Sequence, residues 1–423
     1  MLFTSFSGSL VSRIPGAVQL GTRFNERRSK VSDIDYPALS VTKKGVLPQL
    51  DNAAKTKDGD NRKLVKEGDF VINSRSDRKG SSGVSDRDGS VSLINIVLKP
   101  KGIHPKFSEH LLKSHAFIEE YYRVGRGIVA DLWTTRYDEM RTITISVPSL
   151  EEQTRIANFL DKKTALIDEA ISIKEKQINL LKEHKQIIIQ QAVTQGLDPN
   201  VPMKDSGVDW IGDIPEHWEV VPLKRLAVLS PSVKVSNRKS KELVTFLAME
   251  KVSTDGFIDQ DTLMPICDVS QGFTVFNRGD VIVAKITPCF ENGKSAWLNN
   301  LQTEFGYGST EFHVLRCGQR IIGSFLYLIV SSPLFLNAGE AMMTGSAGQK
   351  RVPSSFIQNF PTAIPGVAEQ EKIVSKVKEL FSQIDVVVAS TVNQIEKLKE
   401  YKTTLINSAV TGKIKITPEM VEQ

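Results

Sequence analysis

Two long stretches of the chain carry the same hydrophobic pattern. Residues 148–194 align without a gap with residues 365–411, and 16 of the 47 aligned pairs are identical, which indicates an internal repeat. Apolar residues recur in the first copy at intervals of three, four and seven, namely Leu160, Ile167, Ile171, Ile178, Leu181, Ile188 and Ala192. Their counterparts in the second copy are all apolar, namely Val377, Ile384, Val388, Ile395, Leu398, Leu405 and Ala409. This spacing is typical of helices that pair through one apolar seam.

Both stretches also carry helix start and stop signals. Pro148 and Pro365 disfavour helix before them, Ser149 with Glu152 forms a capping box, and a glycine follows each stretch. The sequence therefore predicts two helices, 149–195 and 366–412, each of about 45 residues and roughly 65 Å. We expect them to pair with each other as an antiparallel coiled coil. The alternative is a coiled coil between two molecules.

A weaker repeat precedes each helix. Residues 66–72 match residues 277–283 as a Gly-Asp turn that enters an apolar strand, and residues 107–117 match 325–335 with a helical period. The fold class predicted is α+β: two mixed α/β domains, joined by the two long helices, in a pseudo-two-fold repeat. The expected segments are a domain at 1–148, a helix at 149–195, a linker at 196–208, a domain at 209–365, a helix at 366–412 and a tail at 413–423.

Composition excludes several classes of protein. The 423 residues include 54 Lys and Arg against 49 Asp and Glu, a net charge of +5. No apolar run approaches the roughly 18 residues that span a bilayer, and three widely spaced cysteines do not make a disulfide framework. We expect a protein of the reducing cytoplasm without membrane contact, to which nucleic acid is an acceptable partner.

The sequence contains several partial catalytic motifs, but each is incomplete or lies where it is not expected to be functional. Residues 288–295 end like a phosphate-binding loop but lack its first glycine, and the Gly-x-Gly of residues 305–308 is expected to be a hairpin. The Glu-x-Lys triplets at Glu183 and Glu400 lie inside the predicted helices, where charges usually face solvent. The six histidines form no metal-binding pair. We expect no catalytic residue and no metal site.

Basic clusters occur at comparable places in both halves. We predict that they contact DNA, because Arg and Lys in loops supply phosphate and base-edge contacts. The alternative for any one of them is a solvated surface charge. The predicted DNA-binding residues are Arg27, Arg28, Arg75, Arg78, Lys79 and Arg126 in the first half, and Arg238, Lys239, Lys241, Lys285, Lys350 and Arg351 in the second.

Several motifs together resemble the specificity subunit of a type I DNA restriction-modification system. They are residues 147–156 (VPSLEEQTRI), their echo at 364–373 (IPGVAEQEKI), residues 345–352 (GSAGQKRV) and residues 209–218 (DWIGDIPEHW). The resemblance implies two target recognition domains, each of which reads one half of a bipartite, asymmetric DNA site. It also implies helices that act as a molecular ruler and dock modification (methyltransferase) subunits, in two copies, with restriction subunits as possible further partners.

The resemblance implies no cofactor in this chain: S-adenosylmethionine binds the modification partner, and ATP and Mg bind a nuclease partner. The first half departs from the pattern, because it lacks the Trp-rich opening and has residues 125–129 (GRGIV) where the second half has the 345–351 loop.

Two alternative functions belong to other classes of protein. A self-contained adenine methyltransferase would need cofactor and catalytic motifs that do not occur here, whereas a coiled-coil scaffold without DNA specificity needs only the helices.

Overall fold

The computed structural model of the chain describes residues 16–49, 59–127, 133–233, 239–346 and 348–422. Contacts divide the chain into two compact units, residues 1–175 with 392–423 and residues 176–391. Each unit holds one mixed α/β globule and a part of both long helices. The division between the units falls inside helices α4 (Leu150–Thr194) and α9 (Val367–Val410), and the predicted segments instead meet at the helix ends.

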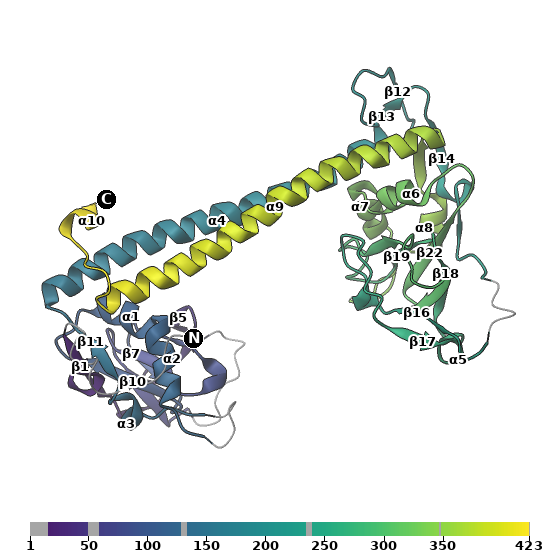
Figure 1. Ribbon diagram of the computed structural model, residues 1–423. Coiled ribbons are helices and arrows are strands. Elements are labelled where there is room, and N and C mark those ends of the chain that lie inside the picture. The colour runs from purple at the N-terminus through teal and green to yellow at the C-terminus, as the bar shows by residue number, and fades with distance from the viewer. Residues whose placement is uncertain (1–15, 50–58, 128–132, 234–238, 347, 423) are drawn as a thin grey trace. The chain divides into compact units, whose positions relative to one another are not determined.

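The two predicted long helices are confirmed. Helices α4 and α9 have 45 and 44 residues, and they run side by side in both units (Figure 1). Every residue of the predicted apolar seam is buried or half-buried, and Ile178, Leu181, Val388 and Leu398 are the half-buried ones. Ser149 Oγ accepts a hydrogen bond from the Glu152 backbone N–H, as the capping box predicts.

Ion pairs between the helices fix their antiparallel register. In the first unit Lys402 Nζ contacts both carboxylate oxygens of Asp168 at 2.7 and 2.6 Å, and in the second unit Lys185 Nζ contacts Asp385. Asp385 and Lys402 are the repeat counterparts of Asp168 and Lys185, so both units use the same pair. Such exposed pairs add little stability, and their role is to set the register.

Each globule contains a four-stranded antiparallel sheet, and the two sheets have equivalent strand orders. In the first unit its order is β2-β10-β7-β8, and in the second unit it is β15-β22-β19-β20. The first sheet consists of β2 (Phe24–Glu26), β10 (Asn95–Pro100), β7 (Phe70–Asn73) and β8 (Ser82–Val84). The second consists of β15 (Ala227–Leu229), β22 (Phe312–Cys317), β19 (Val281–Ala284) and β20 (Ser295–Trp297). The weak repeat ahead of the helices is therefore real.

A two-stranded ladder closes each globule beside its long helix. The first unit pairs β1 (Ala17–Gln19) with β11 (Thr144–Ser146), and the second unit pairs β14 (Glu219–Pro222) with β23 (Pro361–Ile364). The first strand of each ladder opens the sheet region, and the second leads into the long helix. The chain thus enters and leaves each globule at one place.

The remaining strands differ between the globules. The first unit adds β3 (Lys30–Val31), β6 (Arg62–Val65) and β9 (Gly89–Val91) in one sheet and the hairpin β4 (Leu39–Thr42) with β5 (Gly45–Pro48). The second unit adds another four-stranded sheet and the pair β12 (Met203–Asp205) with β13 (Asp213–Pro215), of which β12 lies in the predicted linker. The two globules thus share one sheet arrangement but differ in the strands added to it.

The segment predicted to be a hairpin at residues 305–308 is a central strand, so that prediction was wrong. Strand β21 (Phe305–Gly308) lies between β16 (Leu243–Leu247), to which it is parallel, and β18 (Thr274–Asn277), and β17 (Leu263–Pro265) completes the sheet. Its glycines serve packing: a Cβ on Gly306 would lie 2.5 Å from the Thr245 carbonyl oxygen and 2.7 Å from the Phe276 ring.

The helical periods at 107–117 and 325–335 each form two short helices. Ser114 and Ser332 break them, because each serine Oγ caps the second helix by accepting a hydrogen bond, at 3.2 Å, from a phenylalanine backbone N–H three residues on. The helices are α1 (Pro105–Lys113), α2 (His115–Arg123), α6 (Gly323–Val330) and α7 (Pro333–Ala341). Others are α3 (Tyr137–Met140), α5 (Ile266–Val269), α8 (Ser354–Asn359) and α10 (Pro418–Glu422).

A buried glutamine at the start of each long helix joins that helix to its globule. Gln153 donates to the Pro148 carbonyl at 2.7 Å and accepts from the His104 N–H at 2.8 Å. Its counterpart Gln370 donates to the Pro365 and Arg320 carbonyls and accepts from the Ile322 N–H. Buried backbone groups need such partners. The glutamine that the two helix starts share is therefore structural.

The Trp-rich opening of the second half also supports a helix start. Trp218 is fully buried, and its indole N–H donates to Glu369 Oε1 at 3.1 Å. The His217 Nε2 lies 2.8 Å from the other carboxylate oxygen of Glu369. These contacts hold the first turn of α9 against residues 209–218. The motif that carries much of the family resemblance thus has a packing role.

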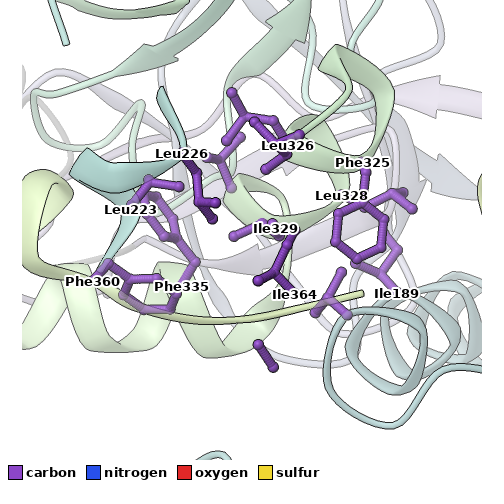
Figure 2. Close-up of a cluster of buried hydrophobic side chains, with 14 of the residues drawn as sticks. Ile189, Leu223, Leu226, Phe325, Leu326, Leu328, Ile329, Phe335, Phe360 and Ile364 are labelled. Carbon is purple, nitrogen blue, oxygen red and sulfur yellow. The ribbon is translucent and has the colours of Figure 1, made fainter. Parts of the chain in front are cut away.

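The core of the second unit joins its globule to α4. Phe335, Phe360 and Leu326 from the globule pack in one cluster with Ile189 of α4 (Figure 2). Phe335 and Phe360 meet edge to face with ring centroids 4.9 Å apart, a favourable geometry.

None of the helices in the described part of the chain combines the length and apolar character that crossing a bilayer requires.

Candidate nucleic-acid interface

Three loops of the second unit meet at the end of β19. They are residues 285–288 after β19, residues 309–311 before β22, and the hairpin 344–351 between α7 and α8. The Lys285 N–H donates to the Glu311 carbonyl at 2.9 Å, and the Lys285 carbonyl accepts from the Val352 N–H at 2.8 Å. The Thr287 N–H donates to the Lys350 carbonyl at 3.0 Å. Lys285, Lys350 and Arg351, which belong to separate clusters in the sequence, are therefore brought together.

The hairpin itself depends on one glycine. Thr344 and Arg351 exchange backbone hydrogen bonds of 3.0 and 2.8 Å, which close the hairpin at its base. Gly345 has a φ of +129°, and a Cβ there would lie only 2.8 Å from the Gln349 carbonyl oxygen. No other residue fits this turn without strain. This hairpin presents Gln349 and Lys350 to solvent, while Ala347 lies outside the described residues.

The first unit has the same arrangement with different side chains. Arg75 lies after β7 at the position of Ile286, one residue beyond the position of Lys285. Arg75 and Arg126 both form backbone bridges with Thr134, as Ile286 and Thr344 do with Arg351. The Ser76 N–H donates to the Trp133 carbonyl, and the Thr135 N–H donates to the Ser74 carbonyl, both at 3.0 Å. Arg75 and Arg126, which were predicted from separate segments, therefore lie next to each other.

Several predicted DNA-binding residues already have an acidic partner. The pairs, with their shortest nitrogen–oxygen distances, are Arg27 with Asp69 at 2.6 Å, Arg28 with Glu26 at 2.6 Å, Lys79 with Glu119 at 2.8 Å, Arg351 with Glu311 at 2.8 Å, Arg126 with Glu139 at 3.5 Å and Arg78 with Asp77 at 3.6 Å. Arg75, Lys239, Lys241, Lys285 and Lys350 have no ion-pair partner in the described part of the chain. For all of them, contact with DNA stays a prediction.

Lys239 and Lys241 lie at a different part of the second unit. They precede β16, and the loop that holds them is fixed to α5 by hydrogen bonds from Cys267 to the Ser240 carbonyl and from Ile266 to the Glu242 carbonyl, at 2.8 and 3.0 Å. Both lysines are exposed. Arg238, predicted with them, lies outside the described residues.

Arg27 serves a structural purpose that its sequence cluster did not indicate. Its guanidinium makes two hydrogen bonds, of 2.6 and 3.0 Å, to Asp69, which is almost fully buried in the Gly-Asp turn. The second unit repeats this with Arg316 and Asp280, at 2.8 Å for both bonds. The hydrogen bonds to Asp69 raise the pKa of Arg27. The repeated Gly-Asp could have revealed the aspartates, but Arg27 follows β2 whereas Arg316 lies in β22, so the arginines do not occupy equivalent positions.

Two residues at these loops were missed at the level of sequence. Trp133 is more than a third exposed beside Arg75 and Arg126, where an aromatic ring can stack on a base. Glu311 makes the two-bond contact with Arg351, and those hydrogen bonds lower the pKa of Glu311. An isolated Trp or Glu in a loop carries no pattern, so no sequence signal marked either one.

A groove of about 1080 Å³ lies elsewhere in the second unit, between its globule and its helices. Its lining includes Tyr327 of α6, Lys185 of α4, and Phe381 of α9. Burial raises the pKa of Tyr327 to about 12, so this hydroxyl stays protonated.

Among the described residues, no group of three or more His, Cys, Asp or Glu has the arrangement of a metal site.

Comparison with known proteins connects this geometry to a family. The family described as the type I restriction modification DNA specificity domain matches residues 18–183, which cover the first globule and most of α4. Residues 18–183 of this chain are therefore similar to type I restriction-modification specificity domains. The residues matched include the loops that bring Arg75 and Arg126 together.

Two named relatives support the same family. The EcoAI type I restriction enzyme specificity subunit of Escherichia coli is 38% identical over 199 residues, and the EcoEI subunit of the same species is 36% identical over 197 residues. Each match covers 46% of this chain and 33% of the relative, so the chain spans about a third of the length of these relatives.

Solved structures share the fold. A chain from a structure described as "Structural basis underlying complex assembly and conformational transition of the type I R-M system" matches with a TM-score of 0.68 at 15% identity, over 95% of this chain and 100% of that one. The HsdS subunit from Thermoanaerobacter tengcongensis matches with a TM-score of 0.52 at 16% identity, over 95% and 98%. Mixed α/β domains with long helices that pack together are thus the fold that this chain shares with these solved structures.

Proposed function

We propose that this chain is the DNA sequence-recognition subunit of a type I restriction-modification complex. Each globule reads one half of a bipartite, asymmetric site, through the loops that gather Arg75 and Arg126 in the first unit and Lys285 and Lys350 in the second. The observation that supports this most is the family match at residues 18–183, because it falls on a globule whose basic loops the second globule repeats.

The proposal assigns the chemistry to partners. The chain itself is non-catalytic and binds no cofactor. Two methyltransferase subunits dock on the long helices and carry S-adenosylmethionine, and restriction subunits, where present, carry ATP and Mg. The target adenine has to leave the DNA stack to reach a methyltransferase pocket, so recognition and chemistry can reside in separate chains. The complex works in the cytoplasm, where the DNA is.

Reconstitution tests the division of labour. The purified chain alone is expected to transfer no methyl group from S-adenosylmethionine to DNA, and addition of the matching methyltransferase subunit is expected to produce methylation at one bipartite sequence. Sequencing of methylated adenines in the product DNA reads the result. Methylation by the chain alone contradicts the non-catalytic assignment, and methylation without sequence preference contradicts the recognition role.

The exposed lysines before β16 supply a second test. Replacing Lys239 and Lys241 together by Ala is expected to weaken DNA binding by the assembled complex and to lower the slope of log affinity against log salt by about 2, since each phosphate contact contributes about 0.9. Lys204→Ala with Lys224→Ala removes the same charge from exposed positions of the same unit and serves as the control. Equal slopes for the two double variants would show that Lys239 and Lys241 only solvate the surface.

A further inference from the structure

One ion pair stands at the centre of the three loops of the second unit. Arg351 belongs to the hairpin 344–351, and its Nε and Nη2 atoms donate to the two carboxylate oxygens of Glu311 at 2.9 and 2.8 Å. Glu311 also accepts the Lys285 N–H through its backbone carbonyl. The pair therefore connects the hairpin to the loop before β22 directly across the loop that carries Lys285.

The geometry of this pair is of the kind that fixes a position. Two parallel hydrogen bonds between a planar guanidinium and a carboxylate hold both groups in one orientation. The Glu311 side chain is about three-quarters buried, and its lowered pKa keeps it charged at neutral pH. A bare carboxylate beside Lys285 would repel a DNA phosphate, so Arg351 both orients and neutralises Glu311.

The first unit lacks the pair at the equivalent positions. Ile94 occupies the place of Glu311, because its carbonyl accepts the Ser74 N–H at 3.4 Å as the Glu311 carbonyl accepts that of Lys285. Thr134 occupies the place of Arg351, because it forms the same two backbone bridges. The pair is thus specific to the second unit and is no general requirement of the shared scaffold.

We infer that Glu311 and Arg351 are a positioning pair for the DNA-reading loops of the second unit, and that Arg351 does not itself contact DNA. This inference rests on the proposed function. The pair holds the hairpin so that Lys285 and Lys350, which have no ion-pair partner in the described residues, point their charges at the DNA. Arg351, one of the residues predicted to bind DNA, acts through them.

Single and double variants in the assembled complex separate positioning from contact. Arg351→Gln and Glu311→Gln are each expected to weaken binding to the recognised sequence by about tenfold, and the double variant by no more than either one, because partners in one pair are coupled. The slope of log affinity against log salt should fall by the same amount in both single variants, because both act through Lys285 and Lys350. If Arg351 instead contacts a phosphate, Arg351→Gln lowers the slope by about 1. Glu311→Gln would then leave binding equal or stronger.

The conservative variant sharpens the test. Arg351→Lys keeps the charge but cannot make the two-bond contact, so positioning predicts that it binds DNA as weakly as Arg351→Gln. Full rescue by lysine would overturn the inference, since a phosphate contact needs only a point charge.

A measurement without DNA keeps the inference independent of the proposed function. In the full chain alone, Glu311→Gln is expected to speed hydrogen exchange of the Thr287, Arg351 and Val352 amides, which the three-loop contact protects. Glu139→Gln, which removes the looser partner of Arg126 in the first unit, is the matched control and should leave those amides unchanged. Unchanged exchange in Glu311→Gln overturns the positioning role whether or not the chain reads DNA.

Discussion

If the proposed function is correct, exchange of residues 20–140 for the equivalent segment of a type I specificity subunit is expected to change one half of the recognised DNA sequence and to leave the other half intact. The first globule has its own sheets and core, and its basic loops all lie within that segment. The ladder between β1 and β11 lies just outside the exchanged residues and holds the two ends of the exchanged segment next to each other. The graft thus joins where the chain already enters and leaves the globule.

Sequencing of methylated adenines in cells that carry the exchanged chain and the proposed methyltransferase partner reports both halves of the site in one experiment. The matched exchange is residues 223–360, which the β14–β23 ladder encloses in the same way. It should alter the opposite half of the site. If either exchange changes both halves, or if neither changes any base, the globules do not read DNA independently and the assignment of one half-site to each is wrong.

The parts of the fold that the sequence predicted are those governed by local periodicity. The helices α4 and α9 were predicted nearly to the residue, because about 45 residues without Gly or Pro carry an unbroken apolar seam between proline and glycine signals. The globules were predicted only as a scaffold, since their strands are short and pair across long stretches of chain. The Phe305–Gly308 strand was missed because its glycines, which make room for Phe276 and for the carbonyl of Thr245, look like turn residues.

In the candidate site, too, some features could be predicted from the sequence and others could not. Basic residues could be picked out by charge, and the structure brings Arg75 to Arg126 and Lys285 to Lys350. Their partners could not be predicted, because Asp69 lies 42 residues from Arg27 and Glu311 lies 40 residues from Arg351. Net charge along a sequence says nothing about which of these cations is already neutralised by a neighbour in space.

Substitution of one residue in the helix seam is expected to have the largest effect on the chain itself. Ile167 on α4 is 8% exposed, whereas its neighbour Leu166 is 49% exposed. Ile167→Asp places a carboxylate in the seam without a partner and should lower the free energy of unfolding by about 3–5 kcal/mol. Leu166→Asp, with the same change in charge one residue away, should stay within about 0.5 kcal/mol of the original chain. Ile178 is a weaker choice because it is only half-buried.

Urea unfolding of the two full-length variants, followed by helical circular dichroism, compares the seam with the outer face directly. Ile167→Asp should also fail to assemble with the methyltransferase subunit, because the docking surface proposed for the helices exists only while they are paired. Loss of assembly by Leu166→Asp with normal unfolding would place that docking surface on the outer face of α4. If instead the original chain elutes as a dimer and Ile167→Asp elutes as a monomer, the repeated seam joins two molecules, and the alternative of an intermolecular coiled coil holds.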